Sequence, residues 1–121
     1  MIINKQVTLT PGTSLNVAQQ LGIANWQVTP VYANSVFIQM VKGGTGMGYV
    51  MCDIAADTSP VPPKSTTSNV AAQLAAASST APGGSWTRAW AVTSGTGIPL
   101  NQLWVDGDQA DGILLSADIK F

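Results

Sequence analysis

The stretch Ile113-Leu114-Leu115-Ser116-Ala117-Asp118-Ile119-Lys120-Phe121 decides the fold class. From Leu115 onward, an apolar residue at every second position alternates with Ser116, Asp118 and Lys120. Side chains of a β-strand point alternately to opposite faces, so this period of two predicts a strand with one buried face. The last part of the chain is therefore expected to be antiparallel sheet.

Similar strand patterns occur upstream of this stretch. Runs rich in β-branched and aromatic residues predict strands at 7–10, 26–32, 35–41, 49–54, 86–93 and 103–105. Residues that favour turns separate them at 11–12, 33–34, 43–48, 94–97 and 106–112, and we interpret 43–48 and 106–112 as hairpin connections. Short strands with frequent turns indicate a single all-β domain, either an antiparallel β-sandwich or a jelly-roll-like fold.

At most one or two short helices are expected. Residues 14–22 fit a helix with Ser14 as the N-cap and Gly22 as the left-handed residue after its end. The alanine-rich stretch 70–77 fits either a two-turn helix or a buried strand. Residues 57–69 are rich in Pro, Ser and Thr and are too long for an ordinary turn, which predicts a central arm that is either disordered or extended and ordered against a partner.

The composition argues against catalysis. The chain contains no histidine, its six acidic residues are all aspartate, and only 9% of its residues are charged. Histidine and glutamate are common proton-transfer groups, and histidine is a common metal ligand. We therefore expect no enzyme activity, no metal and no cofactor. Cys52 has no second cysteine to pair with and is expected to be a small buried hydrophobe.

Charge and hydropathy also restrict the partners. The net charge of −1 and the scattered basic residues predict no nucleic-acid binding. No apolar run reaches the roughly 20 residues that a membrane span needs, and the N-terminus lacks a signal-peptide pattern, so folding in the cytoplasm is expected. A chain that is 45% hydrophobic with so little charge favours association, which predicts a surface covered by neighbouring subunits.

Asp106, Asp108 and Asp111 lie close together in the sequence, and loops rich in oxygen ligands can bind calcium. Their spacing does not fit the EF-hand pattern, because the third Asp is displaced by one position and position 12 falls on Ala117. We favour the simpler interpretation that short Asp and Gly residues form a tight hairpin loop.

Three segments are candidate interfaces. Trp86, Arg88 and Trp90 share one face of a strand, where they could be core tryptophans flanking an outward arginine, an interface anchor, or a sugar platform. The apolar N-terminus with Ile2 and Ile3 either pairs as an edge strand or packs into a neighbour. The arm supplies the remaining candidates, Val61, Pro62 and Pro63.

The stretch 99–116 resembles the closing hairpin of small β-rich virion proteins of tailed bacteriophages, and the start of the strand at 33–38 is similar to theirs as well. The resemblance implies a capsid decoration, or cement, protein on the virion surface, made in the host cytoplasm. It also implies binding to the major capsid protein or other virion subunits as a dimer or trimer. The alternatives are a receptor- or glycan-binding module of a tail fibre, and another tail or connector subunit.

Overall fold

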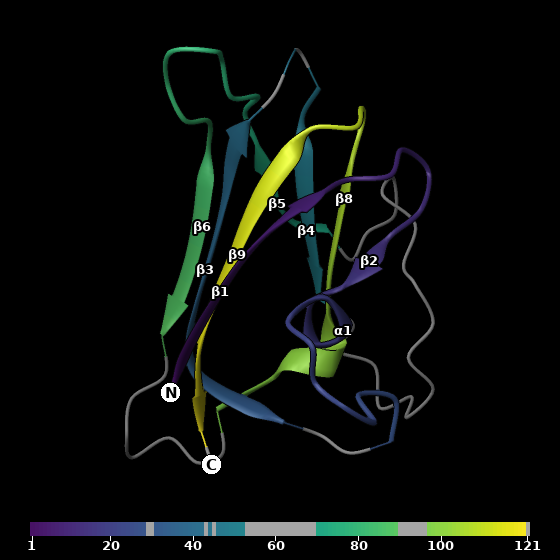
Figure 1. The fold of residues 1–121 in the computed structure, drawn as a ribbon, viewed down its shortest axis with the longest axis vertical. Helices are drawn as coiled ribbons and strands as arrows, with labels where there is room; N and C mark the ends of the chain where they lie inside the picture. The colour runs from purple at the N-terminus through teal and green to yellow at the C-terminus, as the bar shows by residue number, and fades with distance from the viewer. Residues whose placement is uncertain (29–30, 43, 45, 53–69, 90–96, 121) are drawn as a thin grey trace.

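The computed structural model describes residues 1–28, 31–42, 44, 46–52, 70–89 and 97–120. Within these ranges the strands form two antiparallel sheets that share one hydrophobic core, which confirms the predicted all-β fold (Figure 1). Two short helical segments accompany the described strands, α1 (Val17–Gln20) and the 3₁₀ segment η1 (Leu100–Gln102).

The first sheet has five strands. Its order is β1 (Ile2–Thr8), β9 (Gly112–Lys120), β3 (Tyr32–Lys42) and β6 (Ser85–Ala89), and the short β7 (Ile98–Pro99) pairs with the other end of β3. The last of the described strands, β9, thus lies between β1 and β3. The second sheet has four strands in the order β2 (Leu15–Asn16), β8 (Leu103–Gly107), β4 (Gly48–Cys52) and β5 (Val70–Leu74).

Alternate side chains of both sheets fill the space between them. The core residues include Val36, Ile38, Met40, Ile113, Leu115 and Ala117 from one sheet and Val50, Leu74, Leu103 and Val105 from the other. Each fully buried aliphatic side chain contributes about 1.5 to 3 kcal/mol to folding. The predicted alternation of Leu115, Ala117 and Ile119 is confirmed, because all three are buried, and Phe121 lies outside the described residues.

Both connections that we interpreted as hairpins pass between the sheets instead, and those predictions were wrong. The 43–48 segment leads from β3 in the first sheet to β4 in the second, and 106–112 leads from β8 back to β9. β8 pairs with β2 and β4, whereas β9 pairs with β1 and β3. The stretch 99–116 is therefore not a closing hairpin.

Two further predictions failed around β3. Residues 24–28 form turns rather than a strand, because Asn25 adopts a left-handed backbone and its carbonyl accepts the Val28 N–H at 3.1 Å. Trp26 instead packs edge-on against Trp104, with ring centroids 6.1 Å apart. The predicted turn at 33–34 lies inside β3, where Asn34 is the extra residue of a bulge.

The predicted helix at 14–22 is shorter than expected. It forms a single turn, and its N-cap is Asn16 rather than Ser14, because the Asn16 side-chain oxygen accepts the Gln19 N–H at 3.1 Å. Gly22 follows the helix with a φ of 83°, as predicted. Residues 70–74 are a strand, so the strand alternative for 70–77 was the right one. The predicted arm at 57–69 lies outside the described residues.

Candidate functional site

The candidate site is the side of the first sheet that faces away from the core, which we call the outer face. The pairing register assigns its residues, because they alternate with the buried ones along each strand. They are Ile2, Asn4, Gln6 and Thr8 from β1; Leu114, Ser116 and Asp118 from β9; Ser35, Phe37 and Gln39 from β3; and Ser85, Thr87 and Ala89 from β6.

The centre of the outer face is apolar. Val36-Phe37-Ile38 and Ile113-Leu114-Leu115 are runs of three apolar residues on neighbouring strands, so the middle residue of each points outward. Phe37 pairs with Ser116 and Leu114 pairs with Gln39, which makes the two side chains diagonal neighbours. Both are half-buried, and they give an otherwise polar face an apolar centre.

The described residues of the outer face that lie between its two ends carry no charge. Lys42 extends from one end, and Asp118 lies near the other. The length of this area along β9, from Gly112, which pairs with Lys42, to Asp118, is six residues or about 20 Å. Its width across the four strands is about 14 Å. The uncharged area is therefore roughly 280 Å², under half of the about 800 Å² that each partner buries in a standard interface.

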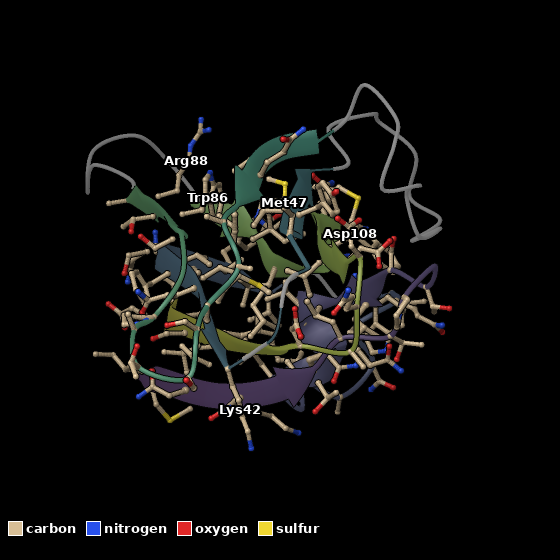
Figure 2. All side chains as sticks on the ribbon, turned by 90° about the horizontal axis from the view of Figure 1, so that it is seen from above. Lys42, Met47, Trp86, Arg88 and Asp108 are labelled. Carbon is tan, nitrogen blue, oxygen red and sulfur yellow. The ribbon has the colours of Figure 1, made fainter. Side chains whose placement is uncertain are left out.

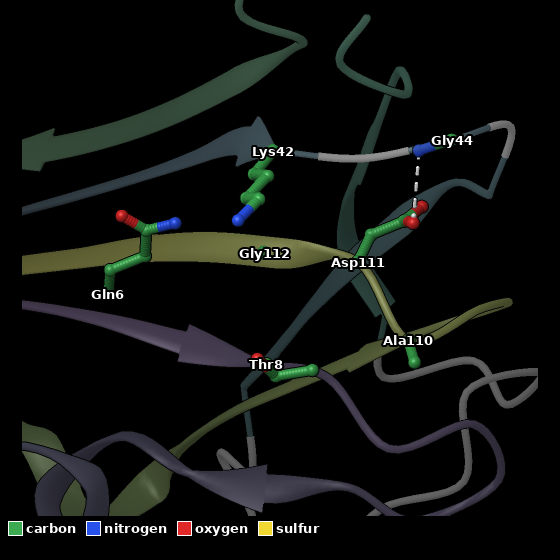
Figure 3. Close-up of a pocket in the computed structure, with 7 residues that line it drawn as sticks. All are labelled: Gln6, Thr8, Lys42, Gly44, Ala110, Asp111 and Gly112. Atoms are coloured by element: carbon green, nitrogen blue, oxygen red, sulfur yellow. Dashed lines mark hydrogen bonds between the residues drawn. The ribbon is translucent and has the colours of Figure 1, made fainter. Parts of the chain in front are cut away.

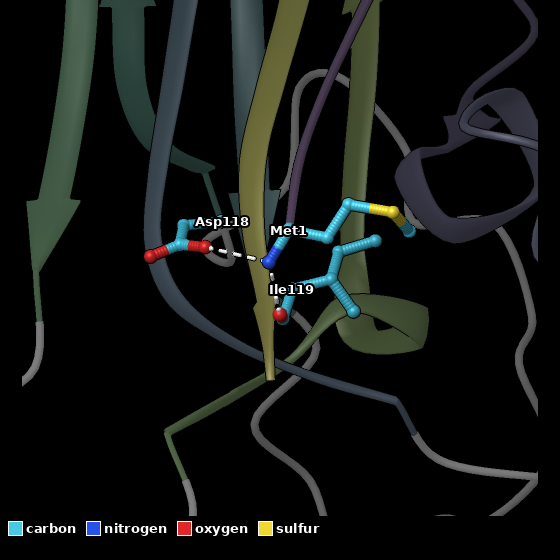
Figure 4. A network of polar contacts seen from close by, with 3 residues as sticks. All are labelled: Met1, Asp118 and Ile119. Carbon is cyan, nitrogen blue, oxygen red and sulfur yellow. Dashed lines mark hydrogen bonds and ion pairs between the residues drawn. The ribbon is translucent and has the colours of Figure 1, made fainter. Parts of the chain in front are cut away.

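The end near Asp118 is held by the N-terminal residue. The Met1 amine lies 3.2 Å from the Asp118 Oδ1 and donates to the Ile119 carbonyl at 3.1 Å (Figure 4). Both side chains are well exposed, so this ion pair adds little stability. It does keep β1 aligned with β9, and it leaves the Ile2 side chain 67% exposed beside the uncharged area.

A pocket of about 480 Å³ lies at the opposite end of the outer face (Figure 3). It is formed where β1, β3 and β9 meet the loops between the sheets, and its lining residues are Gln6, Thr8, Lys42, Gly44, Ala110, Asp111 and Gly112. Sequence reasoning missed this pocket, because residues from three separate segments come together only through the strand register.

The three aspartates of the 106–111 region each bond to a different part of the chain. Asp111 is buried, and its two carboxylate oxygens accept the Gly44 and Gly46 N–H groups at 3.1 and 3.2 Å. Asp106 accepts the Gly107 N–H at 2.7 Å. The two Asp111 bonds hold the glycine-rich segment after β3 against the segment before β9. Within the described ranges, no group of three metal-ligating side chains is brought together.

Asp108 completes this arrangement from the exposed side. Its Oδ1 accepts the Tyr49 hydroxyl at 2.9 Å, and its N–H donates to the Met47 carbonyl at 3.0 Å. The hydrogen bond to Asp108 raises the pKa of the Tyr49 hydroxyl, and burial and the negative charges of Asp108 and Asp106 raise it further. These bonds give the aspartates a structural role, but the tight hairpin loop that we predicted here is wrong, because the segment crosses between the sheets.

The Trp86 and Arg88 side chains face the inner side of β6, since Trp86 pairs with Ile38 and Arg88 with Val36. Trp86 is half-buried and packs against the core, while Arg88 is exposed and extends away from the sandwich (Figure 2). This is the arrangement expected of a core tryptophan beside an outward arginine. The sugar-platform alternative also uses Trp90, which lies outside the described residues, so it stays a prediction.

The other candidate interface residues separate into two groups. Ile2 is exposed on the outer face, and Ile3 is half-buried against the core. Trp90, Val61, Pro62 and Pro63 lie outside the described residues.

Comparisons of the chain with protein-family models, with curated proteins and with solved structures found no match. No helix in the described part of the chain is long and apolar enough to cross a membrane.

Proposed function

We propose that this chain is a non-enzymatic structural protein of a virion, which decorates the assembled head by binding neighbouring coat subunits through its outer face. One observation carries the proposal: Phe37 and Leu114 form an apolar centre inside an uncharged polar face of the first sheet. Interfaces combine such a desolvated apolar core with a polar rim, and charged residues are depleted at their centre.

The composition supports the same function. A chain with 9% charged residues and no glutamate or histidine suits a protein covered by neighbours better than a free catalyst. The uncharged area alone is too small for a stable contact, because it supplies less than half of the area of a standard interface. Other segments of the chain must therefore join the contact, or each copy binds weakly and many copies act together.

The test is co-sedimentation of the purified protein with heads assembled from the major capsid protein of the same virus but lacking this chain. We expect saturable binding. Leu114→Asp places a charge at the centre of the outer face, where docking would bury it without a partner, so we expect an affinity at least about tenfold lower. Val28→Asp is the matched control, because Val28 is 80% exposed and lies outside this face.

The two parts of the proposal fail separately. Absence of wild-type binding to the heads would overturn the proposed function. Full binding by a folded Leu114→Asp variant would leave decoration intact and exclude the outer face as the contact. Thermal unfolding of both Asp variants shows whether each is folded.

A further inference from the structure

The pocket at the end of the outer face brings two nitrogen donors together over Gly112. Lys42 reaches into it from the end of β3, and the amide nitrogen of Gln6 points toward the same space from β1 (Figure 3). Among the residues that the structure describes, neither side chain has a hydrogen-bond or ion-pair partner. Thr8 lines the same space with a hydroxyl.

Gly112 keeps this space open. A Cβ at this position would lie 2.9 Å from the Lys42 Cβ and 3.1 Å from the Gln6 Nε2. Both distances are shorter than ordinary van der Waals contact, so any larger residue would push the two donors apart or fill the floor of the pocket. The backbone conformation of Gly112 does not itself require glycine, because its φ is not positive.

The charges around the pocket select the kind of ligand. Lys42 supplies one positive charge, while the nearby Asp111 carboxylate is already occupied by the Gly44 and Gly46 N–H groups. The single positive charge of Lys42 suits a ligand with one negative charge, and the Asp111 carboxylate, which keeps its own negative charge, opposes a phosphate dianion more strongly than a monoanion. A carboxylate also accepts from two donors at once, as the positions of Lys42 and Gln6 allow.

We propose that this pocket binds a carboxylate group. The identity of its source rests on the proposed function, under which an Asp or Glu side chain of a neighbouring coat subunit enters the pocket. Such a contact places one charge pair at one end of an uncharged face. Charge pairs of this kind fix the orientation of two partners more than they increase their affinity.

Carboxylate binding in the pocket can be tested without capsid heads, by nuclear magnetic resonance of the isotope-labelled protein at constant ionic strength. Acetate is added up to about 200 mM, because isolated exposed ion pairs are weak. We expect saturable shifts in the backbone amide signals of Gln6, Thr8 and Gly112, and none with acetamide. A blocked tripeptide with a central glutamate should reproduce these shifts, and its glutamine counterpart should not.

Two variants and one control complete the experiment. Lys42→Met keeps the length of the side chain but removes its charge, and we expect acetate affinity to fall at least about threefold. Gly112→Ala fills the pocket and should also weaken binding. Lys120→Met removes a lysine at the far end of β9 and should bind acetate as the parent does.

Equal responses to acetate and acetamide, or unchanged affinity in Lys42→Met, would overturn the carboxylate site. Binding of acetate but not of the glutamate peptide would overturn the protein side chain as its source. Neither result depends on head binding, so this proposal and the proposed function can fail independently.

Discussion

The ionisation of Tyr49 is coupled to a hydrogen bond that its hydroxyl makes with the segment between β8 and β9. Its hydroxyl donates to Asp108 at 2.9 Å, and this bond is the main reason for its raised pKa. Ionisation removes the donated proton and places a phenolate beside a carboxylate. The folded state therefore favours the protonated tyrosine, and the bond stabilises the protein below about pH 10, the ordinary tyrosine pKa. That stabilisation is lost as the pH rises through the folded-state pKa.

We expect Tyr49→Phe to lower the free energy of unfolding by about 0.5 kcal/mol at pH 7, the lower end for a hydrogen bond because this one is exposed. Its deficit relative to the parent should shrink above pH 10. Urea denaturation at pH 7 and at about pH 11 measures both. Tyr32→Phe is the control, since its hydroxyl has no hydrogen-bond partner in the described part of the chain. An equal deficit at both pH values would contradict this account.

At the scale of elements, the two outer strands of the first sheet share one feature. β1 and β6 each carry one basic residue on the side that faces the core: Lys5 opposite Leu115 and Arg88 opposite Val36. Both side chains are exposed, so each extends past the rim of the core. Inward-pointing charges on edge strands oppose pairing with another sheet, since a docked strand would enclose them.

Replacing both residues by valine should therefore promote association. We expect the Lys5→Val/Arg88→Val variant to form larger species at concentrations where the parent does not, because its sheet edges lose their charges. Light scattering coupled to gel filtration measures the mass across a concentration series. Lys120→Val removes a lysine from a strand that is paired on both sides and serves as the control. A double variant with the same mass as the parent throughout would rule out a protective role.

The sequence predicted strands better than it predicted their partners. The alternation from Leu115 onward located β9, because burial on one face leaves a period of two. The partner of a strand leaves no comparable signal. The Asp- and Gly-rich segment 106–112 has the composition of a hairpin, but the chain crosses between sheets there. The predicted strand beginning at Trp26 was wrong for a related reason, since the contact that holds Trp26 in place is a tertiary one with Trp104.

The candidate site was only partly predictable. The outward positions of Phe37 and Leu114 follow from two runs of three apolar residues, once each run is known to be a strand. The pocket could not be inferred, because Gln6, Lys42 and Gly112 meet only in the register of three strands. Nothing in their local sequence marks them as neighbours.

At the scale of the whole molecule, one connection joins the two sheets closely. The segment between β5 and β6 passes from the second sheet to the first, and its glycines bond both to β3 and within the segment itself. Gly83 donates to the Met40 carbonyl at 2.7 Å, and Gly84 donates to the Ala75 carbonyl at 2.9 Å. A Cβ on Gly83 would lie 2.3 Å from the Ala75 oxygen and 2.7 Å from the Ala77 nitrogen. Backbone atoms cannot swing aside as a side chain can.

Gly83→Ala should therefore force residue 83 and the Ala75–Ala77 backbone apart, and lower the free energy of unfolding by about 2 to 3 kcal/mol, within the range for overpacked sites. Urea denaturation measures the loss. Gly44→Ala is the matched control, because its new Cβ would make only ordinary contacts, at 3.5 Å from Gln109 and 3.7 Å from Asp111. Equal free energies of unfolding of the two variants would show that the connection accommodates the new Cβ without loss of stability.

The position of β9 between β1 and β3 also bears on how the protein is made. Translation produces β1 and β3 long before residues 112–120 leave the ribosome, and both strands must wait for β9 to complete their pairing. The outer face, with Leu114 at its centre, therefore cannot exist on the early nascent chain. The emerging polypeptide is exposed to mispairing during this interval, but it cannot engage a partner through this face before its own sheet has closed.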